Sequence, residues 1–179
     1  MTSLVRPFRA LRPRPERAAD VIAPPYDVVS TEEARALAAT KPASFLHISR
    51  PEIDLPPGTS PYSDTAYARG AANLARLVQT NVLVRDDTPG YYVYRIAMQG
   101  RVQTGVALAA SVAAYASHRI RRHEHTRPDK ENDRVRNIDS LNAQTGPVLL
   151  AYRANAELRT LVHAAATGAP LMSATGPNE

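Results

Sequence analysis

The sequence predicts a mixed α/β fold of the α+β kind, in which one mixed sheet with a central β-hairpin is flanked by helices. Three observations support this class. Residues 61–80 and 127–142 carry apolar side chains at a helical period. Between them, a strand-like run rich in Tyr and Val is divided by a Gln-Gly pair, which is typical of a hairpin turn. The 179 residues, 44% of them hydrophobic and 22% charged, suit one domain with a real core.

The first half of the chain predicts two helices around one strand. Ser30 and Glu33, three residues apart, form a capping box that begins a helix over residues 31–40. Residues 44–50, SFLHISR, alternate in polarity and predict a strand. A serine at position 60 followed by Pro61 predicts the cap and first residue of a long helix that reaches about residue 80.

The second half predicts a hairpin, a strand and a last helix. Residues 90–112 form the hairpin, with Gln99 and Gly100 as its tight turn. The apolar stretch PVLLAYR, residues 147–153, predicts a strand. Asn155 caps the final helix, which stops at Gly168.

The amino-acid composition excludes some kinds of function and favours others. The chain has no cysteine, which excludes disulfides, cysteine-ligated zinc and thiol catalysis, and fits a cytoplasmic protein. No apolar run is long enough to cross a membrane. The net charge of +5 favours anionic partners without selecting one kind. We expect residues 1–179 to form a single domain in which residues 1–20 and 169–179 are poorly ordered, because both ends are rich in proline or polar residues.

The stretch RRHEHTRPDKENDR, residues 121–134, is the densest group of ionisable side chains. Thr126 and Asp129 form a capping signature, so we expect loop up to residue 126 and helix from 127 to about 142. The pattern predicts that the helix turns its apolar residues inward and aligns its cations on a different face. The inward residues are Val135, Ile138 and Leu141, and the other face holds Arg127, Lys130, Arg134 and Asn137.

Four interpretations of this stretch remain open: a solvent-exposed helix whose charged side chains form salt bridges, a metal site, a nucleic-acid surface and a site for a small phosphate-bearing ligand. A metal site through His123, His125 and Asp129 is disfavoured because nearby cations would repel the ion, and we expect no metal. Nucleic-acid binding is less favoured because no aromatic residue is interleaved for base stacking. Cations that lead into a helix N-terminus favour a phosphate, so the anion site is the leading hypothesis.

A second candidate site is the proline-stiffened turn APPYDVVS. Asp27 in this turn is a carboxylate that can serve a ligand or act as a base, although an Asx turn in which it only bonds nearby backbone explains it as well.

Several blocks together resemble one family, the domain of unknown function 1015. They are PFRALRP with VIAPPYDVVS, NVLVRDDTPGYYVYR, HEHTRPDKENDR and LNAQTGPVLLAY, and they span residues 7 to 152 in the family's order. The resemblance implies a cytoplasmic protein without an established activity. Its signature positions here are Pro24, Pro25, Tyr26 and Asp27, then His123, Glu124, Thr126, Lys130, Asp133 and Arg134.

Usual members of the family are longer and carry an Asp-Gly-His-His-Arg block downstream. That block is similar to one that helps bind nucleotide phosphates in free-serine kinases of the ParB/sulfiredoxin-like superfamily. This sequence lacks it and so resembles an amino-terminal half. The resemblance implies a kinase-like phosphotransferase only together with a C-terminal half-protein; a truncated, non-catalytic fragment that pairs with such a half is the alternative.

We therefore expect a phosphate- or nucleotide-binding protein, with ADP or ATP and magnesium as candidate ligands. Glu124 and Asp27 are the candidate catalytic residues, as base or magnesium-facing carboxylate. The candidate residues for binding the nucleotide or phosphate are Tyr26, Arg122, His123, Thr126, Lys130, Asp133 and Arg134. Nucleic acid is a less favoured partner, and no membrane is expected.

Overall fold

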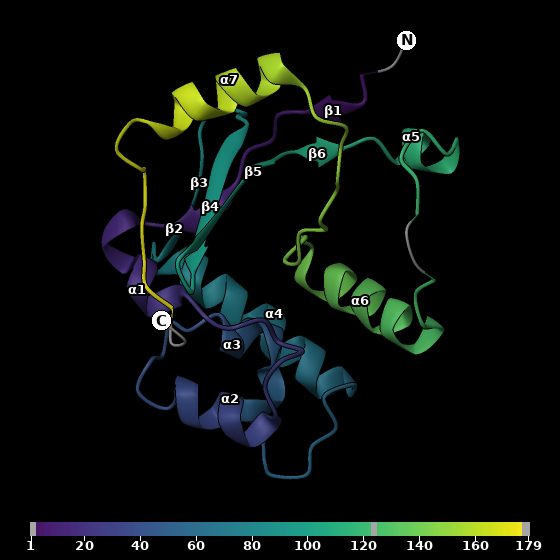
Figure 1. Cartoon of the computed structure of the whole chain (residues 1–179). Helices are drawn as coiled ribbons and strands as arrows, with labels where there is room; N and C mark the ends of the chain where they lie inside the picture. Colours follow the sequence, from purple (N-terminus) through teal and green to yellow (C-terminus); the bar gives the residue numbers. More distant parts are fainter. Residues whose placement is uncertain (1–2, 123–124, 177–179) are drawn as a thin grey trace. The chain divides into compact units, whose positions relative to one another are not determined.

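A computed structural model describes residues 3–122 and 125–176 of the chain (Figure 1). The chain divides into two compact units, which we call the hairpin unit and the helical unit. The hairpin unit consists of Met1–Leu11, Arg85–His125 and Pro147–Leu171. The helical unit consists of Arg12–Val84, Thr126–Gly146 and Met172–Glu179.

The helical unit is built around one long helix. This helix, α4 (Asp64–Gln79), packs against α3 (Leu46–Ser49), the 3-10 helix η2 (Pro51–Asp54) and α6 (Pro128–Leu141), while α2 (Thr31–Ala38) packs on η2 and α3. The 3-10 helix η1 (Pro15–Arg17) and α1 (Ala18–Val21) precede them. Strands β2 (Leu11–Pro13) and β3 (Leu83–Arg85) pair where the chain enters and leaves this unit.

The core of the helical unit lies where these helices meet. Leu46, Ile48 and Leu77 are its largest fully buried side chains. Ser30 closes the predicted capping box with Glu33, since its hydroxyl accepts from the Glu33 amide and the Glu33 carboxylate accepts from the Ser30 amide. The hydrogen bond from the Ser30 backbone amide, and after it the Ser30 side chain, lower the pKa of Glu33, because they stabilise its charged carboxylate. The predicted helix over residues 31–40 is thus confirmed as α2.

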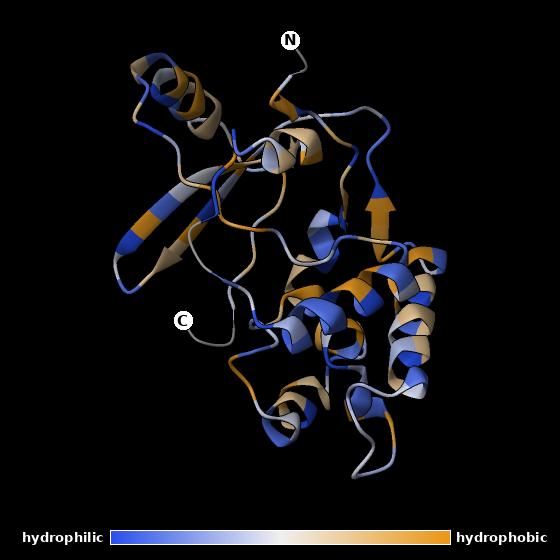
Figure 2. Ribbon diagram, turned by 90° about the vertical axis from the view of Figure 1, so that its right-hand side faces the viewer, coloured by the Kyte–Doolittle hydropathy of each residue, from blue (hydrophilic) through white to orange (hydrophobic). Residues whose placement is uncertain are grey.

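The hairpin unit is named for strands β4 (Tyr92–Met98) and β5 (Arg101–Ala107). They pair antiparallel in an unbroken register from Tyr92 opposite Ala107 to Met98 opposite Arg101. Gln99 and Gly100 both have positive φ angles, of 51° and 73°, as a two-residue turn of type I′ requires. Hydrophilic and hydrophobic residues alternate in one strand of the hairpin, whereas β4 ends in an apolar run (Figure 2). The predicted hairpin and its turn are confirmed.

Short elements complete the hairpin unit. Strands β1 (Val5–Arg6) and β6 (Ala109–Ala110) pair antiparallel, and helices α5 (Val112–Ala116) and α7 (Ala156–Ala166) follow. The side chain of Asn155 caps α7 by accepting from the Leu158 amide, as predicted. The Tyr92 hydroxyl joins residues distant in sequence: it donates to the Asp86 carboxylate at 2.6 Å and accepts from the Ala10 amide at 3.0 Å.

The predicted mixed class is confirmed, since helices and small sheets are both present. The single mixed sheet is wrong for the part of the chain that the structure describes, where the strands form three separate two-stranded sheets. The predicted single domain stays a prediction. Across the described residues, no helix combines the length and apolar character needed to span a membrane.

Two predicted strands are corrected. Residues 44–50 contain the short helix α3 and not a strand. The alternating apolar residues Leu46 and Ile48 predicted a strand, but one short helical turn also brings both side chains into the core. Their backbone bonds locally, as in the 2.8 Å bond from the Arg50 amide to the Leu46 carbonyl. Residues 147–153 are not part of a ladder, and no strand among the described residues pairs with them.

The two longest helices begin differently from the prediction. Helix α4 is capped by Ser63 and not by Ser60, because the Ser63 hydroxyl accepts from the Ala66 amide. Helix α6 has Arg127 at its cap position without a side-chain cap bond, and the Thr126 hydroxyl donates to Glu131 instead.

The inward face of α6 was predicted correctly only in part. Leu141 is buried and Ile138 is half-buried, as predicted, but Val135 is 51% exposed, while Asp133 and Asn137 are buried. The face of α6 that contains Asp133 is turned inward because the Tyr67 hydroxyl and the Arg134 guanidinium donate to the Asp133 carboxylate. Val135 lies on another face, where it stays exposed.

We predict that Leu77→Ala lowers the free energy of unfolding of the helical unit by about 2–5 kcal/mol, because it leaves a cavity in a fully buried position. Leu37→Ala is the matched control, since Leu37 is 37% exposed in the same unit and should cost much less. Chemical denaturation monitored by circular dichroism compares them. Equal losses would show that α4 is not the centre of this core.

Candidate functional site

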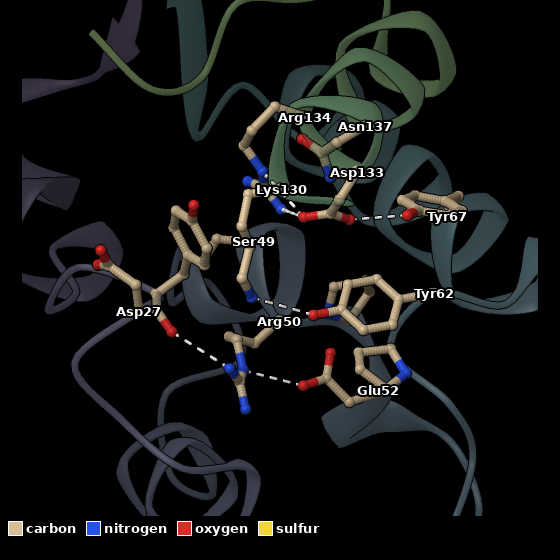
Figure 3. A pocket seen from close by; sticks show the side chains of 13 residues that line it. Asp27, Ser49, Arg50, Glu52, Tyr62, Tyr67, Lys130, Asp133, Arg134 and Asn137 are labelled. Atoms are coloured by element: carbon tan, nitrogen blue, oxygen red, sulfur yellow. Dashed lines mark hydrogen bonds and ion pairs between the residues drawn. The ribbon is translucent and has the colours of Figure 1, made fainter. Parts of the chain in front are cut away.

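A pocket of about 170 Å³ lies within the helical unit (Figure 3). Its walls come from the proline-rich turn, the end of α3 with η2, the start of α4 with the loop before it, and one face of α6. The lining residues are Tyr26, Asp27, Ser49, Arg50, Pro51, Glu52, Pro61, Tyr62, Tyr67, Lys130, Asp133, Arg134 and Asn137. Three cations and three carboxylates stand among them, so the lining is balanced in formal charge.

Asp133 is the buried carboxylate that joins α6 to α4. The Tyr67 hydroxyl donates to its Oδ1 at 2.7 Å. The Arg134 guanidinium donates to its Oδ2 through Nη2 at 2.6 Å and through Nε at 3.1 Å. Asp133 therefore has both an opposite charge and a neutral donor, as a buried carboxylate needs.

The Tyr67 hydroxyl is held in its neutral form. Burial raises the pKa of Tyr67 to about 12, and the hydrogen bond to Asp133 together with the charge of that carboxylate acts in the same direction. A phenolate at this position would be desolvated and would face a carboxylate. Tyr67 therefore acts as a donor over the whole physiological pH range.

Three cations of α6 each lie over one tyrosine ring from another segment. Arg134 lies 4.1 Å from the centre of the Tyr26 ring. Arg136 lies 4.5 Å from the centre of the Tyr67 ring, and Lys130 lies 5.8 Å from that of Tyr62. Such cation–π contacts contribute on the order of 0.5–2 kcal/mol each. They fix α6 against the turn that contains Tyr26 and against the start of α4.

Lys130 is the exposed cation of the pocket. Its Nζ donates to the Tyr62 hydroxyl at 3.2 Å, and this hydrogen bond raises the pKa of Lys130. The ammonium group is therefore charged at neutral pH. Among the described residues no carboxylate forms an ion pair with it, so its charge remains available to a ligand.

Arg50 and Glu52 form the opposite wall. Arg50 Nη1 donates to the Tyr26 carbonyl at 3.2 Å, and Nη2 donates to the Thr31 hydroxyl at 2.8 Å. Its Nε lies 2.9 Å from the buried Glu52 carboxylate, which makes an ion pair, but the N–H group does not point at the oxygen and is left without a hydrogen bond. Arg50 thus mainly holds the proline-rich turn in place.

Asn137 is a buried amide that lines the pocket without a partner. The residue is 5% exposed, and within the described part of the chain its side chain makes no hydrogen bond. Its amide atoms are not fully enclosed, so they face the pocket and can pair with a group that enters it. In Figure 3 Asn137 lies beside Asp133 and Arg134.

The pocket brings together five of the residues predicted from the sequence: Tyr26, Asp27, Lys130, Asp133 and Arg134. Lys130, Arg134 and Asn137 share the face that the sequence pattern indicated. Asp27 contributes to the rim, where Figure 3 shows its carboxylate directed away from the other labelled side chains. No hydrogen bond to its carboxylate is present within the described residues, so nothing supports the Asx-turn alternative.

Other predicted site residues lie elsewhere. Arg122 belongs to the hairpin unit, where its guanidinium lies 5.0 Å from the centre of the Tyr115 ring. Thr126 does not line the pocket and donates to Glu131 at 3.0 Å. Arg127, predicted to share the cationic face, pairs instead with Asp129, which lowers the pKa of that carboxyl. His123 and Glu124 lie outside the described residues.

Sequence reasoning missed Arg50, Glu52, Tyr62 and Tyr67. Arg50 ends the segment predicted as a strand and Glu52 follows it, which gave no reason to place them at a site. Tyr67 and Tyr62 were counted as ordinary positions of a long helix. No local pattern marks these four residues, because their place at the pocket depends on contacts with segments distant in sequence, such as those of Arg50 with Tyr26 and of Tyr67 with Asp133.

Within residues 3–122 and 125–176, no three His, Asp or Glu side chains gather closely enough to hold a metal ion. The pocket does offer several hydrogen-bond donors to a ligand. On the α6 face of the pocket, Arg134 Nη1 and the Asn137 amide have no acceptor among the described residues, and Lys130 Nζ bonds only the Tyr62 hydroxyl.

We predict that Tyr67→Phe lowers the free energy of unfolding by about 1–3 kcal/mol at neutral pH, because the buried Asp133 loses a donor. It should also change the pH dependence at alkaline pH. The unfolded chain loses the Tyr67 proton near the ordinary pKa of 10, while the folded chain keeps it until about 12, so wild-type stability should fall as pH rises between these values.

Denaturation at several pH values tests this, with the difference between wild type and variant as the readout. Tyr94→Phe is the control, because the Tyr94 side chain is 62% exposed in the hairpin unit. If the difference does not shrink between pH 10 and 12, Tyr67 does not carry the raised pKa.

Comparison with known proteins places the chain in a family. No curated protein and no solved structure matches it. One family, described as "Protein of unknown function (DUF1015)", matches residues 5–179, which is nearly the whole chain and includes every residue of the pocket. The chain is therefore a member of the DUF1015 family.

Proposed function

We propose that the pocket of the helical unit binds a small ligand through its phosphate group. One observation carries this proposal: a single face of α6 presents Lys130, Arg134 and Asn137, each with donor groups that no described residue fully uses. Charge-assisted donors on one face suit a group with several acceptor oxygens. Phosphate is the common biological group of that kind.

The volume restricts what can enter. Pockets that enclose a drug-sized ligand usually measure about 300–1,000 Å³, and this one measures about 170 Å³. A phosphate group with a few further atoms fits such a space. A nucleotide would place one phosphate in the pocket and leave its base outside, so ADP and ATP remain candidates together with simpler phosphate esters.

A kinase-like role is the finer form of this proposal. Phosphoryl transfer needs charge neutralisation, a carboxylate and usually magnesium. Asp27 at the rim is the candidate carboxylate among the described residues, and Asp133 is less suited because Tyr67 and Arg134 already use it. We propose the transfer reaction only together with a C-terminal half-protein, in the cytoplasm.

A nucleic-acid surface is a weaker alternative. Binding along a phosphate backbone needs an excess of cations, whereas this lining is balanced in charge. A steep decrease of affinity for an oligonucleotide with rising salt would favour that alternative.

We predict that Lys130→Ala weakens binding of inorganic phosphate, ADP or ATP by about 10- to 100-fold, since one charge-assisted hydrogen bond contributes roughly 1.5–3 kcal/mol. Lys41→Ala is the matched control, because Lys41 is the only other lysine and does not line the pocket. Isothermal titration calorimetry with and without magnesium measures both. Absence of heat with all three ligands for the wild type would overturn the proposal.

We further predict that Asn137→Asp abolishes phosphate binding, because it keeps the shape of the side chain and adds a negative charge inside the pocket. Asn137→Leu should reduce binding less while leaving the melting temperature nearly unchanged, since the Asn137 side chain makes no hydrogen bond within the described residues that the substitution would remove. Differential scanning fluorimetry with and without phosphate checks both variants. Full binding by Asn137→Asp would exclude the amide from the site.

A further inference from the structure

The hairpin unit has almost no buried core of its own. Among the described residues, the only buried one in this unit is Ala114. Large apolar side chains are exposed on it instead, including Tyr94, Ile96 and Met98 on β4. A unit that exposes this much apolar surface is typical of one that packs against another chain.

The exposed residues of β4 lie on one face. Side chains two positions apart point to the same side of a strand, so Tyr94, Ile96 and Met98 form one stripe. Opposite them in the register stand Gly105, Gln103 and Arg101, which leave the stripe uncovered. The hairpin has two strands only, so β4 and β5 each keep one edge without a strand partner within the described residues.

Residues 147–153 form a segment that lacks a strand partner. Their sequence, PVLLAYR, is typical of a strand, yet no backbone hydrogen bond to them is present within the described part of the chain. Leu149 is 78% exposed, and Val148 and Tyr152 are also largely exposed. An extended apolar segment without partners and a sheet with free edges are the two halves of a β-augmentation interface.

We propose that residues 147–153 of one chain add as a strand to the free edge of the β4–β5 hairpin of a second copy, and that two chains do so reciprocally. Each chain contains one donor segment and one acceptor hairpin. In a two-fold dimer, the segment of each chain therefore pairs with the hairpin edge of the other chain, as in an isologous interface. This proposal is independent of the phosphate site, which lies in the helical unit.

The area available agrees with a weak dimer. Tyr94, Ile96, Met98, Val148, Leu149 and Tyr152 are each exposed by 46% or more. Burying one such side chain completely removes roughly 60–120 Å² of apolar surface from water, so the exposed parts in two copies amount to on the order of 450–900 Å² at most. With the strand backbone added, the interface approaches the lower range of stable ones, which begins at about 1,200 Å². We expect a dissociation constant in the micromolar range.

Electrostatics gives the dimer a distinguishing property. Each copy carries a net charge of +5, and the proposed surfaces include Arg95, Arg101 and Arg153. Salt screens repulsion between like charges, so dimerisation should strengthen with ionic strength. Phosphate binding should weaken under the same change, which separates failure of one proposal from failure of the other.

Sedimentation equilibrium of the full chain from low to high micromolar concentration tests the proposal. We expect a monomer–dimer equilibrium in the wild type. Leu149→Asp should shift its dissociation constant at least tenfold towards the monomer, because it puts a charge in the donor strand. Leu171→Asp is the matched control, since Leu171 is similarly exposed in the same unit but lies outside both surfaces. A monomeric wild type at all concentrations, or equal effects of the two substitutions, would overturn the proposal.

Cross-linking locates the contact. The chain has no cysteine, so Leu149→Cys mixed with Ile96→Cys or with Val102→Cys should give a disulfide-linked heterodimer. Mixing Leu149→Cys with Val78→Cys, which is exposed on α4, should not. If a dimer forms but Leu149→Cys links to neither hairpin position, the strand does not add to the hairpin and the proposed interface is wrong.

Discussion

The hydrogen bond from Tyr67 to Asp133 connects the parts of the helical unit that make the pocket. It joins α4 to α6 at 2.7 Å between two buried side chains that are 66 positions apart in sequence. Asp133 then orients Arg134, and Arg134 lies over the Tyr26 ring of the proline-rich turn. One buried carboxylate thus links three walls of the pocket.

A buried carboxylate is an expensive way to fix a helix. The free-energy cost of its desolvation is offset only while both the phenol and the guanidinium remain in place. An apolar residue at this position would not depend on such partners. The arrangement does leave the rest of the α6 face polar. Lys130 and Asn137, one turn to each side of Asp133, consequently face the pocket and not a hydrophobic core.

The sequence predicted what is encoded locally. The capping box of Ser30 and Glu33, the turn at Gln99 and Gly100 and the cap at Asn155 each depend on residues a few positions apart, and all three are present. Prediction failed where distant residues decide. Apolar pattern favoured Val135 as an inward residue, but Tyr67 in another segment turns Asp133 inward. The strand expected at residues 147–153 needs a partner that the described chain does not supply.

The candidate site divides in the same way. Tyr26, Asp27, Lys130, Asp133 and Arg134 were identified from their sequence context, and the pocket includes them. Arg50 and Tyr67 were not, because their importance comes only from tertiary contacts.

The three stacked pairs between α6 and tyrosines have an evolutionary consequence. Arg134 with Tyr26, Lys130 with Tyr62 and Arg136 with Tyr67 each combine one position of a single helix with one position of a separate segment. A cation that loses its ring, or a ring that loses its cation, gives up the stabilising contact between the two segments. Selection should therefore act on each pair as a unit, so that in diverging descendants the two members change together while neighbouring exposed positions of α6 drift independently.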